Sequence, residues 1–493
     1  MKCRRGSEMP ESLPLLVERA AKNFYRRRLV TVVIGLVVAF AVGSENAIIL
    51  PTAWKYLQSL GSRDETDFGI LISAFNVGGL ISSVFFGWLV DRRMDLCKRI
   101  VFVGAMIQIP GNVMYFLGIH KWFVISARFI CGLGSGIIAV ILAELARATS
   151  NEERTKYLTL GFGCRQLGLL FGPAYNFGLH DIHTHFGDVS VDEGSLPGLI
   201  FAIFWALALV AIFAGYENIG KLHHSLQMLQ EYAKESESIK YGTFSSIPAT
   251  SDRHPVASTA AREPEVRVLP LPSSTPYRNK FQREIPYDRL DDVVHSSFLD
   301  LLTDTTVVIL FMQITFFFGQ YMVETIIPPT MQDSFGLGNQ ENSLFYLLIG
   351  CEAILSFVFV ILVRKRLLDR TVIMIGNVLI VIGLVSLMLT TWVQTSHPDY
   401  AFPFFISSCT FVFLGVPMAS VSSVALASKT VGPESQGKMQ ALRRVASSVG
   451  LILGPLWAGA FVFDRFVLCG VTIIMFLIQI FLFVLSYARM IPK

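Results

Sequence analysis

Twelve long stretches of this chain carry little or no charge, and they limit its fold more than any other feature. Eight of them contain no Asp, Glu, Lys or Arg, and four carry an internal charge. Each is long enough to cross about 30 Å of hydrocarbon as a helix. Only helices and closed barrels cross without unpaired backbone groups, and continuous rather than alternating apolar runs favour helices. The stretches are 29–50, 68–90, 100–118, 123–146, 156–178, 199–216, 306–323, 342–363, 371–393, 400–428, 445–463 and 466–488.

The composition agrees with a membrane protein and excludes several other classes. Hydrophobic residues make up 53% of the chain and charged residues 16%, whereas an average globular chain has about 25% charged residues. The 38 Gly, 21 Pro and 7 Cys follow no period, which excludes collagen-like, disordered and disulfide-scaffold proteins. A net charge of +4 is too small to indicate a nucleic-acid partner. The cysteines lie in predicted spans or on the cytosolic side, so we expect no disulfides.

Lys and Arg residues gather in alternate connections, and this asymmetry predicts the orientation of the chain. Eight stand in the first 28 residues, and the connections after the second, fourth, eighth and tenth stretches are also basic. By the positive-inside rule both termini are therefore cytosolic. The first stretch begins only at Leu29, after a basic tail, so we expect no cleavable signal peptide. The connections on the other side carry Lys55, Arg63, Lys121 and Arg465.

A polar segment, 217–301, separates the sixth and seventh stretches. It is rich in Ser, Pro and charged residues, and it predicts a largely disordered cytosolic linker. Its first part, 221–234, is typical of either an amphipathic helix on the membrane surface or plain linker. The chain therefore divides into a cytosolic tail (1–28), a six-helix bundle (29–216), the linker (217–301), a second six-helix bundle (302–487) and a short cytosolic end (488–493).

The two halves repeat one another in sequence. Glu45 and Glu324, near the ends of the first and seventh stretches, are each followed by a Pro-Thr pair and are 279 residues apart. The Gly-x-x-x-Gly-Pro motif of the fifth stretch returns 282 residues later in the eleventh. Two helix pairs with nearly one offset indicate a duplicated six-helix unit. The motif residues, which we expect to let helices pack closely and rock, are Gly168, Gly172, Pro173, Gly450, Gly454 and Pro455.

Two further motifs point to a transporter family. The second stretch ends in Gly87-Trp-Leu-Val-Asp91-Arg92-Arg93, and the fourth contains Arg128 followed by Gly132, Gly134 and Gly136. Both motifs resemble those of the major facilitator superfamily. The resemblance implies an all-α membrane protein with twelve transmembrane helices in two pseudo-symmetric six-helix bundles. The alternative for the first motif is an ordinary basic loop.

The resemblance also implies roles for the motif residues. Gly87 would permit close approach of helices, and Asp91 would face the positive N-terminal end of a neighbouring helix, which locks the cytosolic side. The glycines of the fourth stretch would form a smooth packing face, and Arg128 would reach the central cavity. A gate contact between Arg92 and Glu144, at the cytosolic ends of two helices, is a further hypothesis.

Three segments are similar to a narrower group of proteins. The segments are Trp54-Lys-Tyr56-Leu57-Gln58, Glu324-Thr-Ile-Ile-Pro and Gly432-Pro-Glu-Ser-Gln-Gly437. They resemble the major facilitator superfamily domain-containing protein 8 group, also called the ceroid-lipofuscinosis neuronal 7 proteins. This resemblance implies a lysosomal or late endosomal membrane protein linked to the movement of anions, notably chloride.

Two short segments fit sorting signals of such a compartment. Glu11 with Leu15 and Leu16 fits an acidic dileucine signal, placed in the tail where clathrin-adaptor complexes would read it. Tyr287-Asp-Arg-Leu290 fits a tyrosine-based signal and is the weaker match.

Charges that remain inside spans are functional candidates, because each costs roughly 2.5–3.5 kcal/mol at a helix centre on insertion scales. Arg165 and Glu352 lie near the midplane on helices that meet across the halves in the family fold. Our first hypothesis is that they pair when the cavity is closed on one side. The alternative is that each finds only local partners.

The second hypothesis treats Glu45 and Glu324 as symmetric protonatable groups and Arg128 as an anion contact. Burial favours the neutral form of a carboxyl group, and a nearby Arg opposes that effect. Anion binding to Arg128 would therefore release Glu45 to accept a proton. The alternative is that both glutamates are helix-end charges that reach water by snorkelling.

These observations predict a secondary active transporter for a small solute, most simply an anion. It would work by alternating access, with coupling to protons, in an endolysosomal membrane. A channel-like anion conductor on the same fold and a non-transporting, carrier-shaped receptor remain alternatives. The sequence has no phosphate loop, nucleophile elbow or metal-ligand spacing, so we expect no enzyme activity, cofactor or metal site. The expected partners are the lipid bilayer, the substrate, protons and the adaptor complexes.

Overall fold

The computed structural model describes residues 13–149, 151–182, 184–186, 189–242, 303–363, 366–430 and 436–487. Within these ranges, the residues up to Leu229 and those from Asp304 onward form one compact unit, and the segment from Gln230 to Thr303 is a second unit. Nearly all of the described elements are helices, as the apolar stretches predict. The expected all-α membrane fold is therefore confirmed.

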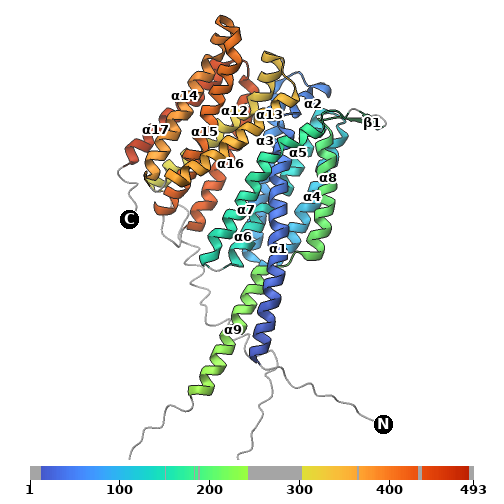
Figure 1. Cartoon of the computed structure of the whole chain (residues 1–493), viewed down its shortest axis with the longest axis vertical. Helices are drawn as coiled ribbons and strands as arrows, with labels where there is room; N and C mark the ends of the chain where they lie inside the picture. Colours follow the sequence, from blue (N-terminus) through green and yellow to red (C-terminus); the bar gives the residue numbers. More distant parts are fainter. Residues whose placement is uncertain are drawn as a thin grey trace, which may run out of the picture. The chain divides into compact units, whose positions relative to one another are not determined.

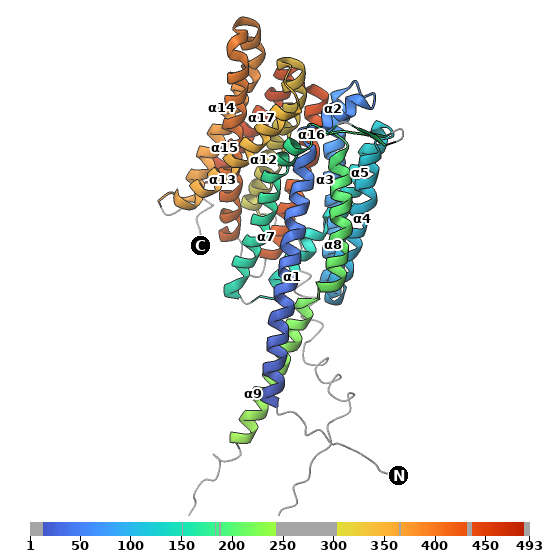
Figure 2. The ribbon, with the colours of Figure 1, turned by 45° about the vertical axis from the view of Figure 1, so that its right-hand side comes forward.

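The first half of the compact unit, here the N-half, contains the elements of stretches one to six. Figure 2 shows α1, α3, α4, α5 and α8 of this half side by side. In chain order the elements are α1 (Leu13–Ile49), α2 (Ala53–Ser59), α3 (Glu65–Arg92), η1 (Met94–Leu96), α4 (Cys97–Leu117), α5 (Lys121–Ser135), α6 (Ile137–Arg147), α7 (Asn151–Phe171), η2 (Pro173–Gly178), β1 (Thr184–Phe186), β2 (Val189–Val191) and α8 (Leu196–Gly215).

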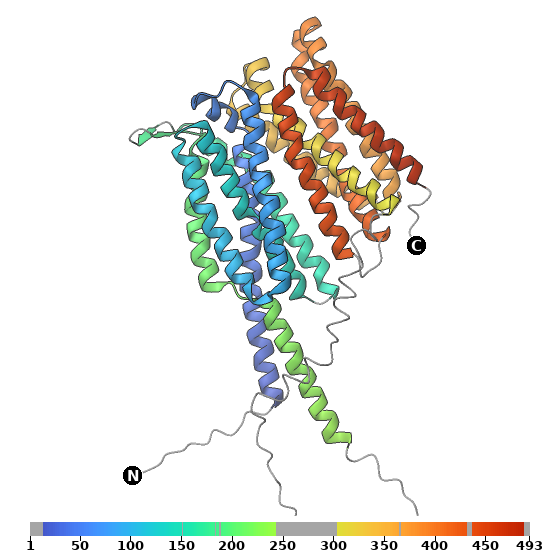
Figure 3. The same cartoon turned by 180° about the vertical axis from the view of Figure 1, so that it is seen from behind.

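The second half, here the C-half, contains stretches seven to twelve. Figures 1 and 3 show its helices, coloured yellow to red, as one bundle seen from opposite sides. The helix α9 (Ile219–Gly242) follows the N-half along the chain. The elements of the C-half are α12 (Asp304–Pro329), η4 (Thr330–Ser334, a π-helical turn), α13 (Asn339–Val363), α14 (Asp369–Ser396), α15 (Pro398–Thr430), α16 (Gln436–Phe461) and α17 (Arg465–Ser486).

The described helices account for all twelve predicted spans. Eleven helical segments in the described ranges are long and apolar enough to cross a membrane. The twelfth span is α7, which is less apolar because it carries Lys156 and Arg165, and which packs along α1. Large apolar side chains cover the outward faces of the bundle, such as Leu207, Val210 and Phe213 on α8. Such a surface suits lipid contact, because hydrocarbon replaces water around it.

Three predicted spans differ from the structure for local reasons, two at an end and one in the middle. The helix α1 begins at Leu13, so most of the predicted tail is already helical. The fifth span leaves the α-helical form after Phe171, because Pro173 starts a 3₁₀ turn. The fourth span is divided into α5 and α6 at Gly136.

The packing of helices repeats between the halves. The pair α1 with α7 recurs as α12 with α16, the pair α3 with α5 recurs as α13 with α15, and the pair α4 with α8 recurs as α14 with α17. The predicted duplication of a six-helix unit therefore exists in three dimensions. The halves meet chiefly where α3 packs against α16 and where α13 packs against η2 and α7.

We name the two ends of the compact unit by their contents. The basic end holds the connections α3–α4, α6–α7 and α13–α14. The α2 end holds α2, the first turns of α13 and the small antiparallel sheet, in which Thr184 pairs with Val191 and Phe186 with Val189. The helix α4 ends at the α2 end, where Gly118 adopts the left-handed conformation that stops a helix. By the charge pattern, the basic end is the predicted cytosolic side.

The predicted linker starts with a regular helix. The helix α9 includes the whole of 221–234. Its first part, up to Leu229, packs on the N-terminal extension of α1, where the rings of Phe24 and His223 lie 5.3 Å apart and Leu226 is buried. The membrane-surface position that we considered for it is not shown. Residues 243–302, with the predicted tyrosine-based signal, lie outside the described residues, as does Glu11 of the dileucine signal.

Candidate functional site

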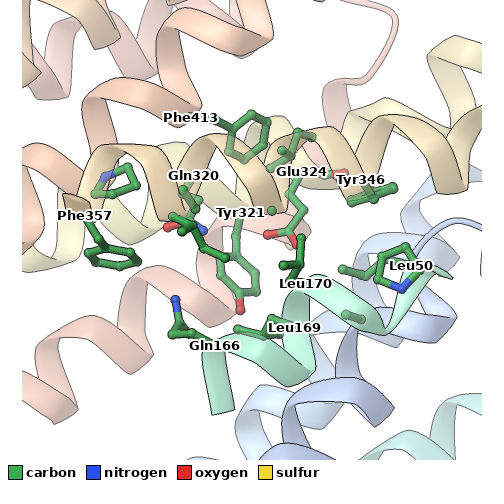
Figure 4. Close-up of a pocket in the computed structure, with 17 residues that line it drawn as sticks. Leu50, Gln166, Leu169, Leu170, Gln320, Tyr321, Glu324, Tyr346, Phe357 and Phe413 are labelled. Carbon is green, nitrogen blue, oxygen red and sulfur yellow. Dashed lines mark hydrogen bonds between the residues drawn. The ribbon is translucent and has the colours of Figure 1, made fainter. Parts of the chain in front are cut away.

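A cavity of about 100 Å³ lies between the two halves. It is lined by α1 and by α7 with η2 from the N-half, and by α12, α13 and α15 from the C-half. Most of the lining is apolar, and the polar exceptions converge from both halves. They are Gln166, Gln320, Tyr321, Glu324 and Tyr346 (Figure 4). A space of this size admits several water molecules or a small solute.

Glu324 is the carboxyl group of this cavity. Figure 4 shows Glu324 and Tyr321 pointing from α12 toward α7. The Oε2 atom of Glu324 is buried without a hydrogen-bond partner, and no ion pair of the described residues includes this side chain. The hydroxyl of Tyr346 donates to the backbone oxygen of Glu324 at 2.6 Å, which ties α13 to α12 at this level. A buried carboxyl without a partner is costly in a membrane interior, so Glu324 is a candidate for a functional role.

Arg165 stands beside the cavity on α7. It lies within electrostatic range of Tyr321 and of Arg444 on α16. No ion pair between the described residues includes Arg165 or Arg444, and Arg444 donates to the Ser83 hydroxyl at 3.4 Å. Arg165 belongs to the N-half and Arg444 to the C-half. Two like charges from opposite halves therefore lie within electrostatic range of one another, and no ion pair of the described residues neutralises either.

Glu45 occupies a different environment, inside the N-half. Its side chain is fully buried; Asn112 of α4 donates to Oε1 at 2.8 Å, and Trp205 of α8 donates to Oε2 at 3.0 Å. The Cys131 thiol lies within hydrogen-bonding reach of both Glu45 and Arg128. Arg128 is 3% exposed, and its guanidinium lies 4.4 Å from the centre of the Phe75 ring. Neither charge is among the residues that line this cavity, so the expectation that Arg128 reaches the central cavity stays a prediction.

The two glutamates are not at equivalent positions, although their sequence offset suggests it. A Cβ on Gly168 would lie 2.1 Å from the Phe40 oxygen, and a Cβ on Gly450 would lie 2.5 Å from the Ile314 oxygen. Phe40 and Ile314 therefore mark equivalent levels of α1 and α12. Glu45 follows Phe40 by five residues, and Gly319 follows Ile314 by five residues. Gly319 lies next to Phe476 of α17, as Glu45 lies next to Trp205 of α8. Glu324 lies five residues farther on, about 7.5 Å along the helix axis. The spacing of motifs along the sequence does not reveal this shift, because it does not tell at which height along the helices the residues pack.

Arg165 and Glu352 are not paired in this structure. Gly350 is a residue of α13 that touches α7, since its added Cβ would lie 2.6 Å from the Leu170 side chain. Glu352 is one turn before Ser356, which hydrogen-bonds to α15. The Glu352 carboxyl group is accordingly hydrogen-bonded to the Thr410 side chain of α15. The hypothesis of a pair across the halves therefore places Glu352 on the wrong face of its helix for this conformation.

The charged groups at the basic end form other contacts than we expected. Asp91 pairs with the Arg147 side chain at 2.6 Å rather than with a helix N-terminus. Arg92 stacks on Trp88, and it is not paired with Glu144. Glu144 is instead buried and accepts a hydrogen bond from the Gly220 N–H at 2.8 Å. This carboxylate therefore caps the first turn of α9 and fastens it to the N-half.

The glycine motifs let backbones touch, but not always the expected ones. An added Cβ on Gly132 or Gly136 would collide with α3, and one on Gly134 with α4. In the repeated motif, Gly168 and Gly172 face α1, while Gly450 and Gly454 face α12, so none faces the other half. Pro173 begins η2 and lines the cavity, and the Pro455 oxygen meets Gly69 of α3. Gly87 meets nothing within 4 Å, so it brings no helix close in this conformation.

Hydrogen bonds between the halves concentrate at the α2 end. Along α3, bonds to α16 come from Thr66, Ser73 and Asn76, all in the part of α3 nearer that end. Near the basic end, the described residues give the Arg444–Ser83 contact. Hydrogen bonds therefore join the two halves between the cavity and the α2 end. Further bonds at the α2 end link Gln58 with Gln332, Glu193 with Asn339, Pro51 with Asn342 and Asn176 with Ser343.

A model of the Major Facilitator Superfamily matches residues 34–225 and 297–492, which is most of the chain. The chain belongs to the Major Facilitator Superfamily. Over 467 residues it is 22% identical to major facilitator superfamily domain-containing protein 8 of Xenopus laevis, covering 83% of this chain and 81% of that protein. It is also 27% identical over 222 residues to an SPX domain-containing membrane protein of Arabidopsis thaliana, covering 44% of this chain and 30% of that protein.

Solved structures of this superfamily share the fold. A D-xylose-proton symporter superimposes with a TM-score of 0.62 at 14% identity, covering 92% of this chain and 97% of the symporter. A bacterial homolog to the human lysosomal transporter Spinster, in an inward-facing and occupied conformation, gives a TM-score of 0.63 at 10% identity, covering 94% and 97%. These likenesses confirm the twelve-helix superfamily fold. The protein is therefore a membrane transporter of this family and not an enzyme.

Several residues of the site were missed from sequence. Gln166, Gln320 and Tyr346 line the cavity, and Asn112 and Trp205 hold Glu45. Our search considered only ionisable side chains inside the spans. Uncharged polar side chains inside an apolar stretch are also costly in lipid, and that signal would have indicated the three amides.

Proposed function

We propose that this transporter is a secondary active carrier for a small anionic solute, working by alternating access and coupled to protons through Glu324. The observation that carries the proposal is the pair of uncompensated charges at the cavity between the halves. One is the carboxyl group of Glu324, which lines the cavity, and the other is the guanidinium of Arg165, which lies within electrostatic range of the cavity residue Tyr321. Charges kept in a membrane interior without partners are costly, so their retention indicates a role in binding or coupling.

The arginines support an anionic substrate. Arg165 and Arg444 approach from opposite halves and repel one another. An anion between them relieves this repulsion and draws the halves together, and Arg is well suited to bind carboxylate or phosphate oxygens with two parallel hydrogen bonds. A substrate that links one charge on each half is what an alternating-access carrier needs.

Glu324 supports coupling to protons. It is the acidic side chain among the cavity-lining residues, and Tyr321 stands within electrostatic range of both Glu324 and Arg165. A change in the charge of Glu324 therefore alters the electrostatic environment of the anion site. The D-xylose-proton symporter shows that this fold serves proton-coupled transport in another protein.

An endolysosomal location is the compartment that we propose. The relative in Xenopus belongs to the group that the sequence motifs resemble, and a solved neighbour is a homolog of a lysosomal transporter. Leu15 and Leu16 of the proposed sorting signal are 55% and 39% exposed at the start of α1, as adaptor binding requires. Replacing both with Ala should move the protein from lysosomes to the cell surface, as measured by immunofluorescence and surface biotinylation. Unchanged lysosomal location would contradict this use of the signal.

Uptake by proteoliposomes tests the proposed function. Purified protein is reconstituted with an inward proton gradient, and uptake of labelled chloride, phosphate and small carboxylates is compared with that of a neutral sugar. We expect saturable uptake of one anion class, counterflow, and at least a tenfold loss in Arg165→Gln. Arg165→Lys should keep part of the activity, and Arg63→Gln, an exposed arginine near α2, serves as the matched control. Equal anion uptake by Arg165→Gln and the wild type would overturn the proposal.

The same vesicles separate a carrier from a channel-like conductor. A carrier shows counterflow and no unitary currents in planar bilayers, whereas a conductor shows current steps and no counterflow. A receptor without transport shows neither.

A further inference from the structure

One buried arginine of the C-half has no carboxylate partner. Arg465 is the first residue of α17, and it is 7% exposed. Its Nη2 atom donates to the Thr330 hydroxyl of η4 at 2.5 Å, whereas its Nη1 atom is buried without a hydrogen-bond partner. The preceding residue, Asp464, is exposed and accepts from the Val467 N–H at 3.1 Å as the N-cap of α17. No ion pair between the described residues includes Arg465, so its charge is not neutralised by them.

The other buried arginines of the described chain differ from Arg465 in this respect. Arg28 is also 7% exposed and pairs with Glu153 at 2.6 Å. Arg128 is 3% exposed and lies within electrostatic range of Glu45. A buried arginine does not avoid the cost of burial by losing its proton, because a guanidinium stays charged at every physiological pH. A buried charge without a partner is unfavourable, so Arg465 calls for an anion that the described side chains do not supply.

The groups around Arg465 offer hydrogen-bond donors. The thiols of Cys409 on α15 and Cys469 on α17 lie within electrostatic range of the guanidinium, and both cysteines are buried. The Thr330 hydroxyl accepts from Arg465, and none of the described residues accepts its own proton. The ring centre of Phe405 lies 5.9 Å from the guanidinium carbon. A guanidinium N–H, a hydroxyl and two thiols beside an apolar ring are a set of donors that suits an anion.

We propose that Arg465 and Thr330, with the thiols of Cys409 and Cys469, bind a small monovalent anion such as chloride, which holds α15 and η4 against the start of α17. Because the residues around the guanidinium are buried, the room favours a single-atom anion over a larger organic acid. None of these four residues lines the cavity between the halves. The proposal therefore goes beyond the proposed function, since an anion bound here stabilises the C-half whether or not an anion is transported.

A bound anion should raise the stability of the folded protein. The site joins residues of η4, α15 and α17, so it exists in the folded C-half and not in the unfolded chain. An anion that binds only the folded state stabilises it by mass action, and the effect saturates as the site fills. Screening of surface charges by salt depends instead on ionic strength, whatever the size of the anion. Anion size therefore separates the two effects.

Thermal unfolding of the purified protein in detergent tests the proposal without any transport assay. Unfolding is followed by tryptophan fluorescence, in sodium chloride and in sodium gluconate at equal ionic strength. Gluconate serves as an anion that is too large for the site. We expect the wild type to melt about 2–4 °C higher in chloride, with an effect that saturates as the chloride concentration rises.

Variants locate the anion. Arg465→Gln should lose the chloride effect, and Thr330→Val should raise the chloride concentration needed for half of the effect by about tenfold, because it removes one hydrogen bond to a charged group. Arg165→Gln alters the proposed substrate site and should keep the effect, as should Arg63→Gln, the exposed control arginine.

A chloride effect that is absent from the wild type, or kept in full by Arg465→Gln, would overturn the proposal. An unchanged half-saturating concentration in Thr330→Val would also contradict it. A chloride effect lost in Arg165→Gln but kept in Arg465→Gln would place the anion in the cavity alone, which removes this site and leaves the proposed function standing.

The two cysteines provide a second measurement at the site itself. Alkylation by a maleimide is followed for each cysteine by mass spectrometry, well below the melting temperature, where local opening controls the reaction. At a chloride concentration of about twice half-saturation, Cys409 and Cys469 should react about threefold more slowly than in gluconate, and Arg465→Gln should abolish this difference. Cys97, which is equally buried in the N-half, is the internal control and should react alike in both salts. Equal slowing at Cys97 would contradict a local site.

Discussion

At the scale of single residues, surroundings separate the two glutamates that look alike in sequence. Glu45 accepts hydrogen bonds from two neighbouring helices and shares its site with Arg128. Glu324 has a buried oxygen without a partner and faces the cavity. The Glu45 carboxyl is therefore held in place by donors of its own half, whereas the Glu324 carboxyl has no such fixed partner. We therefore propose a structural role for Glu45 and keep Glu324 as the candidate for coupling.

Exchanging each glutamate for glutamine should separate these roles. We expect Glu324→Gln to abolish accumulation driven by a proton gradient while counterflow continues. Glu45→Gln should keep pH-dependent uptake but lower thermal stability, because the new amide group meets other donors in a buried site, at a cost of about 1–3 kcal/mol. The measurements are uptake at two pH values and thermal unfolding in detergent. Loss of pH dependence in Glu45→Gln alone would reverse the assignment.

A second residue-level prediction concerns Arg165 and Glu352. Because Glu352 lies on the face of α13 toward α15, we expect the exchange variant Arg165→Glu with Glu352→Arg to transport no better than Arg165→Glu alone. Uptake by the two single variants and the exchange variant provides the check. Restored transport in the exchange variant would mean that the helices rotate enough to pair the two charges in another conformation.

At the scale of elements, helix contacts depend on the absence of particular Cβ atoms. Gly168 of α7 and Gly450 of α16 lie against the backbone of α1 and α12, so these helix pairs approach closely. Small residues at such contacts are a general feature of membrane helix packing, because close backbones gain van der Waals contact that lipid does not provide. The same α7 helix also carries a glycine with free space, Gly163.

These two glycines of one helix make a matched pair of variants. In Gly168→Ala the new Cβ would lie 2.1 Å from the Phe40 oxygen, so α1 and α7 must separate. We expect destabilisation of about 1–3 kcal/mol, typical of overpacking. Gly163→Ala should be neutral or stabilising by up to about 1 kcal/mol, because alanine favours helix. Thermal unfolding in detergent measures both, and equal stability of the two variants would contradict the packing argument.

At the scale of the whole molecule, the hydrogen bonds between the halves describe one state of a transport cycle. They gather at the α2 end, and Glu193 adds a charged group to that set. A carrier must break this set to expose its cavity on the α2 side, whereas a conductor does not have to do so. The distribution of contacts therefore leads to a test that separates the two functions.

Locking the α2 end provides that test. Gln58 and Gln332 contact one another across the halves. We expect a disulfide between Gln58→Cys and Gln332→Cys to stop uptake and a reducing agent to restore it, because alternating access requires the halves to separate there. The control is each single cysteine variant under the same oxidant. Continued flux through the cross-linked protein would favour the conductor.

Sequence alone determined the membrane class, the twelve spans, the duplication and the superfamily, because lipid selects long apolar helices and each span is a local property of the chain. It also indicated which charges to examine. Only the tertiary structure decided which charges meet: Glu45 with Asn112 and Trp205, Glu144 with the start of α9, and Glu193 with Asn339. The physical reason is that a side chain's partner depends on the rotation and level of helices that are distant in sequence. Residue offsets do not contain that information, as the five-residue shift between Glu45 and Glu324 demonstrates.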